Sequence, residues 1–173
     1  MIRRIYLDID GVLNAFGADH LPGAWPSYRR EEITAEWDDG DMPTRVIVHV
    51  APEVLAAVHD WHDRGVEIVH MTTWAHNARR FDERFGLPVF ESLTPHGNGS
   101  FLDFEKLPAV HEHLRAAPAD RVVWVDDYLV PQASPLALRW VDRTPGIWTV
   151  APEGALGLRQ HDLDRIERLL YRS

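Results

Sequence analysis

Two pairs of acidic residues stand out because each pair follows a short apolar run. Asp8 and Asp10 are separated by one residue and precede Gly11, and Asp126 and Asp127 follow a second apolar run far along the chain. Carboxylates gathered in one place repel one another, so their pKa values rise unless a cation neutralises them. Since all of these ligands offer oxygen, the predicted cation is Mg²⁺, which binds a few carboxylates together with a substrate phosphate.

Such a cluster could carry out phosphoryl transfer. Asp8 could stay ionised beside the metal and attack phosphorus, while Asp10 could protonate the leaving oxygen. Thr72, at the end of another apolar run, offers a hydroxyl group to the phosphoryl oxygens. Lys106, the only lysine of the chain, offers a positive charge that counters both the phosphate and the aspartates. The residues therefore predict a magnesium-dependent phosphatase.

Predicted strands and helices would bring these residues together. Apolar runs at 5–9, 66–72 and 121–125 predict buried strands, and 89–90, 138–141 and 147–150 are further strand candidates. Helical spacing is present at 53–64, 77–85, 106–116 and 162–171. This alternation predicts a single α/β domain over 1–173, with a Rossmann-like, mostly parallel sheet and helices on both faces. In such sheets the ligand site lies at the carboxyl ends of the strands, where the acids and Thr72 fall.

The segment 15–50 is a sizeable insertion between the first strand and the first helix. Residues 32–37 and 44–50 flank the turn-forming cluster at 38–41, which predicts a β-hairpin. The segment is too short for a large cap domain, so we expect a small flap over the rim that carries Asp8. We expect Trp74 and His76 on the opposite lip of that rim.

The sequence resembles the haloacid dehalogenase (HAD) superfamily of phosphatases at all four of its motifs, in the family's order. DIDGVLN at 8–14 resembles the first motif, and VHMT at 69–72 resembles the second. Lys106 resembles the third motif, and VVWVDD at 122–127 resembles the fourth. Within the superfamily, the chain is similar to the stand-alone domains associated with bacterial and phage nucleic-acid repair proteins, of the Swiss Army Knife RNA repair type.

This resemblance implies a role for each acid. Asp8 would form an aspartyl-phosphate, and its carboxylate would hold Mg²⁺ together with the backbone carbonyl of Asp10 and the carboxylate of Asp126. Asp127 would support the metal through water or orient Lys106. Many relatives carry a further acid just after the fourth motif, whereas here the sequence YLVP follows.

Residues beside the motifs are candidates for substrate contact. These are Gly11, Thr73, Trp74 and His76, of which Trp74 could stack on a base or sugar. An open site would admit a nucleic-acid end, whereas the formal net charge of −9 favours a small phosphorylated metabolite over a polyanion. The oligomeric state is left open.

Composition excludes several other classes of site. The chain has no cysteine, which excludes disulfides, thiolate catalysis and Cys-ligated zinc and fits the cytoplasm. No apolar run approaches a membrane span or a signal peptide. Two further functions remain on the same fold: a dehalogenase or phosphonate-cleaving enzyme, against which Asp10 counts, and an inactive binding domain, against which the presence of all four motifs counts.

Overall fold

Five parallel strands form the central sheet of the protein, which a computed structural model describes over residues 1–20, 24–36, 42–95 and 106–171. Across the sheet the strands are β5 (Glu91–Leu93), β4 (Glu67–Met71), β1 (Arg3–Leu7), β6 (Arg121–Val125) and β7 (Ile147–Val150). Each neighbouring pair is parallel. Alternate residues of one strand point to opposite faces of a sheet, and both faces here are apolar.

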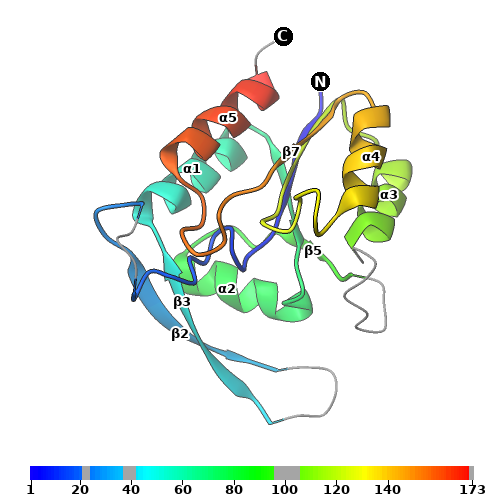
Figure 1. The fold of residues 1–173 in the computed structure, drawn as a ribbon. Helices are drawn as coiled ribbons and strands as arrows, with labels where there is room; N and C mark the ends of the chain where they lie inside the picture. Colours follow the sequence, from blue (N-terminus) through cyan, green and yellow to red (C-terminus); the bar gives the residue numbers. More distant parts are fainter. Residues whose placement is uncertain (21–23, 37–41, 96–105, 172–173) are drawn as a thin grey trace.

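Helices cover both faces of this sheet (Figure 1). One face packs against α1 (Pro52–Asp63), α2 (Ala78–Phe85) and α5 (Gln160–Tyr171). The other packs against α3 (Lys106–Ala116) and α4 (Pro135–Arg143). The predicted α/β, Rossmann-like fold is therefore confirmed. None of the helices in the described ranges is long and apolar enough to cross a membrane.

Two predicted strands are wrong. Residues 138–141 lie inside α4, where Pro135 suits the first helical turn and Ala137 and Val141 are buried one turn apart. The strand predicted at 89–90 begins later, at Glu91. The reason is that the Phe90 N–H donates to Asp82 Oδ2 at 3.0 Å, so a side chain takes the place of a neighbouring strand.

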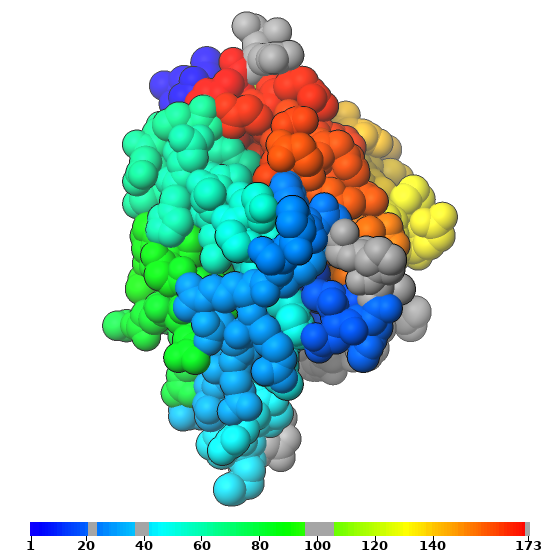
Figure 2. All heavy atoms as spheres, turned by 90° about the vertical axis from the view of Figure 1, so that its left-hand side faces the viewer, coloured from blue at the N-terminus to red at the C-terminus, as the bar shows by residue number. Residues whose placement is uncertain are grey.

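An antiparallel hairpin of β2 (Arg29–Ala35) and β3 (Thr44–Val50) stands apart from the sheet, and no large cap is present in the described ranges. It packs on α2, as Figure 2 shows, with Arg84 bonded to Glu31 at 2.6 Å. Beside α2 is the short 3₁₀ helix η1 (Ala75–Asn77), and Asn77 forms two hydrogen bonds with the backbone of Glu36.

The hairpin therefore lies on the same side of the rim as η1. The expectation that it faces Trp74 and His76 from the opposite lip is wrong, because the end of β2 is bonded directly to η1, of which His76 is a residue. The predicted tip at 38–41 lies outside the described residues.

Candidate active site

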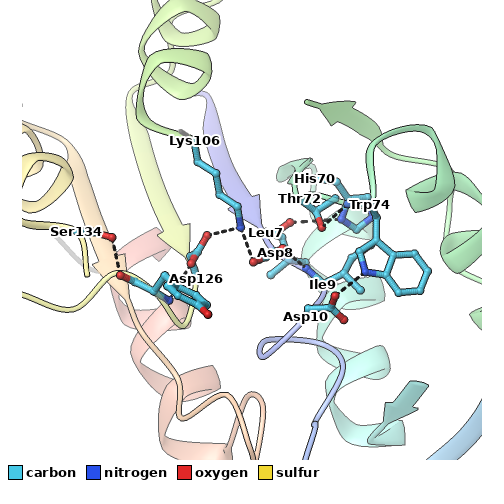
Figure 3. A network of polar contacts seen from close by, with 11 residues as sticks. Leu7, Asp8, Ile9, Asp10, His70, Thr72, Trp74, Lys106, Asp126 and Ser134 are labelled. Carbon is cyan, nitrogen blue, oxygen red and sulfur yellow. Dashed lines mark hydrogen bonds and ion pairs between the residues drawn. The ribbon is translucent and has the colours of Figure 1, made fainter. Parts of the chain in front are cut away.

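Three neighbouring strands end in the polar residues that the sequence singles out. Asp8 follows β1, Thr72 follows β4 and Asp126 follows β6, and β1 lies between the other two strands. Backbone bonds continue the pairing past the strand ends, since the Asp8 N–H donates to the Val125 carbonyl at 3.1 Å. The three side chains consequently meet at one edge of the sheet (Figure 3).

Lys106, the first residue of α3, lies between two of the acids. Its Nζ donates to Asp8 Oδ2, and it also donates to Asp126 Oδ2 at 2.7 Å. Only 8% of Lys106 is exposed, while Asp8 is 5% and Asp126 is 0% exposed. The lysine is thus placed at the site, as its position in the sequence predicts, and it leaves both acids with hydrogen-bond partners.

Burial and charge oppose each other at these three groups. Burial raises the pKa of Asp8 to about 6, although Lys106 lowers it, and the Asp126 charge adds to the rise. Burial likewise raises the pKa of Asp126, again against the influence of Lys106. For Lys106, burial lowers the pKa, but the charges of Asp8 and Asp126 outweigh this and the pKa is raised. The lysine therefore stays protonated.

Asp127 completes a group that fits a divalent metal ion. Carboxylate oxygens of Asp8, Asp126 and Asp127 lie within 4.8 Å of one another. Burial raises the pKa of Asp127 to about 6, and the charge of Asp8 contributes. A hard cation such as Mg²⁺ takes oxygen ligands and would relieve the repulsion between the acids. The carboxylate of Asp10 is not part of this group. The metal contact through the Asp10 backbone carbonyl, which the resemblance implies, stays a prediction.

Two glycines make room for Asp127. A Cβ added to Gly11 or Gly154 would overlap the Asp127 carboxylate, and Gly11 has a φ of +71°, which favours glycine. The Gly11 N–H donates to the Asn14 carbonyl at 3.0 Å. Gly11 thus uses its own N–H within the loop and leaves room for the Asp127 carboxylate, while its predicted contact with substrate stays a prediction.

Asp10 points toward β4 and the segment that follows it. Its Oδ1 accepts from Asn14 Nδ2 at 2.9 Å, and its Oδ2 accepts from Trp74 Nε1 at 2.8 Å. Trp74 is only 1% exposed. The prediction that Trp74 stacks on a base or sugar is therefore wrong for this arrangement, because neither face of the ring is open to solvent.

The other predicted site residues differ in exposure. Thr72 is fully buried next to Asp8, and its hydroxyl oxygen accepts from the Trp74 N–H at 3.3 Å. Thr73 and His76 are exposed at the rim, where they could contact a ligand.

Some residues of the site were missed by sequence reasoning. Asn14 belongs to the first motif, which is the signal that could have identified it, but Gly154 has no such signal. A third case is His70 in β4, which is fully buried and bonded to Asp82 Oδ1 at 2.8 Å. A polar histidine within an otherwise apolar strand indicates a buried hydrogen-bond partner, and this signal could have identified it.

Comparison with known proteins identifies a family. A family model described as "HAD domain in Swiss Army Knife RNA repair proteins" matches residues 4–163. The match contains all of the site residues described above. A comparison with curated proteins found no match.

Proposed function

The chain belongs to the family of HAD domains in Swiss Army Knife RNA repair proteins, and on this premise we propose that it is a Mg²⁺-dependent phosphatase acting through an aspartyl-phosphate. One observation carries the proposal. Asp8 ends the central strand with a carboxylate that is bonded to Lys106 and grouped with Asp126 and Asp127. A nucleophile, a fixed positive charge and a set of metal ligands are thereby gathered in one place.

In the first step, an oxygen of Asp8 attacks the phosphorus of a phosphate monoester. A bond from phosphorus to Asp8 forms, the bond to the leaving oxygen breaks, and Asp10 gives its proton to that oxygen. The Lys106 ammonium offsets negative charge on the phosphoryl oxygens, and the Thr72 hydroxyl is a further donor. Mg²⁺, held by Asp8, Asp126 and Asp127, would supply additional positive charge when bound.

In the second step, a water molecule attacks the phosphorus of the aspartyl-phosphate. Asp10, now ionised, accepts a proton from this water, the bond from phosphorus to Asp8 breaks, and inorganic phosphate leaves. One carboxyl group thus acts first as acid and then as base. A haloacid dehalogenase has no leaving oxygen to protonate, so the presence of Asp10 favours phosphate ester hydrolysis.

For the substrate, the RNA repair context in the family's description favours the terminal phosphate of a nucleotide or nucleic-acid end. A small phosphorylated metabolite is the second candidate, because the formal net charge of −9 does not attract polyanions. Oligonucleotides phosphorylated at the 5′ or the 3′ end, compared with sugar phosphates, would distinguish these two substrate classes.

The proposed function can be tested with 4-nitrophenyl phosphate. We expect hydrolysis that requires Mg²⁺ and stops with excess chelator, and a loss of several orders of magnitude in kcat for Asp8→Asn, because the nucleophile is removed. Acid quenching should trap one phosphoryl group on the peptide that contains Asp8. Asp164→Asn, an exposed position on α5, is the matched control and should keep full activity. Full activity of Asp8→Asn, or in chelator, would contradict the proposal.

A further inference from the structure

Both oxygens of the Asp10 carboxylate are held by buried side chains. Asn14 donates to Oδ1 and Trp74 donates to Oδ2, at 2.9 and 2.8 Å. The exposed fractions of these partners are 3% and 1%, so neither can swing away without opening the core. The indole N–H is only a donor, and the amide donates through its nitrogen, so both bonds fix the direction in which the carboxylate points.

Each of the two partners is itself anchored. The Trp74 ring packs edge-to-face on Phe81 of α2, with ring centroids 5.9 Å apart. The amide oxygen of Asn14 accepts from the backbone N–H of His49 in β3 at 2.9 Å. Because Asn14 is bonded at one end to Asp10 and at the other to the hairpin, it connects the hairpin to the acid–base group.

Burial alone does not fix the orientation of the Asp10 side chain. It lies in the loop after β1 and is partly exposed, whereas Asp8 is buried and bonded to Lys106. A general acid must lie within hydrogen-bond reach of the oxygen it protonates. A misplacement of about 1 Å can lower a rate by about 10²-fold. The two buried donors therefore act on the group for which orientation matters most.

We propose that Trp74 and Asn14 are positioning residues that orient Asp10 for proton transfer to the leaving group. The inference rests on the proposed phosphatase function and adds a role for two side chains that are bonded to Asp10. It replaces the predicted stacking role of Trp74. It also makes the end of β3 part of the catalytic arrangement, through the bond between His49 and Asn14.

The test is the dependence of kcat/KM on the leaving group. This parameter reports the step in which the leaving group departs, and a poor leaving group needs a proton far more than a good one does. We therefore compare 4-nitrophenyl phosphate with phenyl phosphate and a simple alkyl phosphate. Trp74→Phe removes the indole donor but keeps an aromatic ring. Asn14→Leu keeps a similar volume and removes the donor to Asp10, together with the acceptor of the His49 N–H.

For either variant we expect kcat/KM on the alkyl phosphate to fall about 10- to 100-fold. On 4-nitrophenyl phosphate it should change by less than about threefold, since that leaving group needs little protonation. Asp10→Asn removes the acid itself and should lower kcat/KM on the alkyl phosphate by about 10²- to 10⁴-fold, which is the upper limit for the other two variants. Adding Trp74→Phe to Asp10→Asn should have little further effect, because both changes remove the same function.

Trp61→Phe is the matched control. Trp61 is a buried tryptophan of α1 that also donates its indole N–H to a carboxylate, Glu167 Oε2, at 3.1 Å. It lies away from the site, so its substitution should leave the leaving-group dependence unchanged.

Three outcomes would overturn the inference. An unchanged leaving-group dependence in both Trp74→Phe and Asn14→Leu would show that Asp10 needs neither donor. An equal loss on all substrates would show that the two residues have a purely structural role. If the unsubstituted protein hydrolyses no phosphate ester, the proposed function itself fails and the inference fails with it. The first two outcomes leave the phosphatase function intact, so the two failures are distinguishable.

Discussion

At the scale of single residues, opposing influences act on the carboxyl group of Asp8, the proposed nucleophile. Its bonds with Lys106 and with the Ile9 N–H favour the ionised form, yet burial and the charge of Asp126 raise its pKa to about 6. A nucleophile has to be ionised to attack, and a bound cation favours that form. In the absence of metal, folding therefore makes the ionised form of Asp8 less favourable than it is in the unfolded chain.

This balance predicts a pH-dependent difference between Asp8→Asn and the unsubstituted protein in excess chelator. The pKa of Asp8 rises from 3.8 to about 6 on folding, so its contribution to the free energy of unfolding is present below 3.8 and is lost as the pH rises through about 6. Asparagine does not titrate. The thermal midpoint of Asp8→Asn should therefore exceed that of the unsubstituted protein by more at about pH 7.5 than at about pH 4.5.

The measurement is thermal unfolding followed by circular dichroism at the two pH values. Adding Mg²⁺ at the higher pH should raise the midpoint of the unsubstituted protein more than that of the variant, because the variant lacks one charged ligand. Asp164→Asn again serves as the control and should show no such pH dependence. A difference that shrinks as the pH rises would mean that Lys106 outweighs burial at Asp8.

The positions of single residues at the site could be predicted from the sequence only in part. Asp8, Asp126 and Lys106 were found because their types and order match a mechanism, and the structure places all three together. The true partner of Trp74 could not be found in this way. An aromatic residue after a strand is equally compatible with exposure and burial, and only packing against Phe81 of α2 decides between them.

At the scale of elements, the hairpin stands out because it is tied to the rest of the protein at both of its strands. The end of β2 is bonded to Asn77 through Glu36, and β3 is bonded to Asn14 through His49. The hairpin is accordingly fixed near both of its ends, on the turn side through Glu36 and at the opposite end through His49.

We expect the predicted turn of the hairpin, at 38–41, to influence substrate preference. Replacing residues 38–41 by an Asn-Gly turn, which suits a two-residue hairpin, leaves Glu36 and His49 in place. This variant should raise KM for the preferred substrate and change the ranking of substrates, because a flap selects what enters without taking part in the chemistry. Hydrolysis of 4-nitrophenyl phosphate should stay largely intact. Equal loss on all substrates would make the hairpin a structural element only.

Sequence patterns predicted most elements of this fold because most strands are buried on both faces and read as apolar runs. The strands at 121–125 and 147–150 and the helix at 106–116 agree with the structure. The segment 138–141 was mispredicted because Leu138, Trp140 and Val141 fit a short strand as well as a helix turn. Pro135, a residue that suits the first turn of a helix, would have favoured the helix.

At the scale of the whole molecule, charge limits how a nucleic acid could bind. The formal net charge is −9, and several arginines near the hairpin are already paired with glutamates. Binding that follows a nucleic-acid backbone needs lysines and arginines to replace the cations around each phosphate. A protein of this charge is better suited to recognise one terminal phosphate and the nucleotide that carries it.

We therefore expect the length of an oligonucleotide substrate to matter little. For RNA carrying the preferred terminal phosphate, kcat/KM of a dinucleotide should lie within about threefold of that of a long strand, because only about one or two phosphates are contacted. Raising the salt concentration from about 50 to 200 mM should lower kcat/KM less than about tenfold, whereas contact with six to ten phosphates would lower affinity by about 10³- to 10⁵-fold. The measurement uses a series of end-phosphorylated oligonucleotides at constant Mg²⁺, with 4-nitrophenyl phosphate as the control for effects of salt on the chemistry itself. A rate that climbs with strand length and falls steeply with salt would contradict this expectation and would require a basic path for the strand. A preference for sugar phosphates over every oligonucleotide would instead favour the metabolite as substrate.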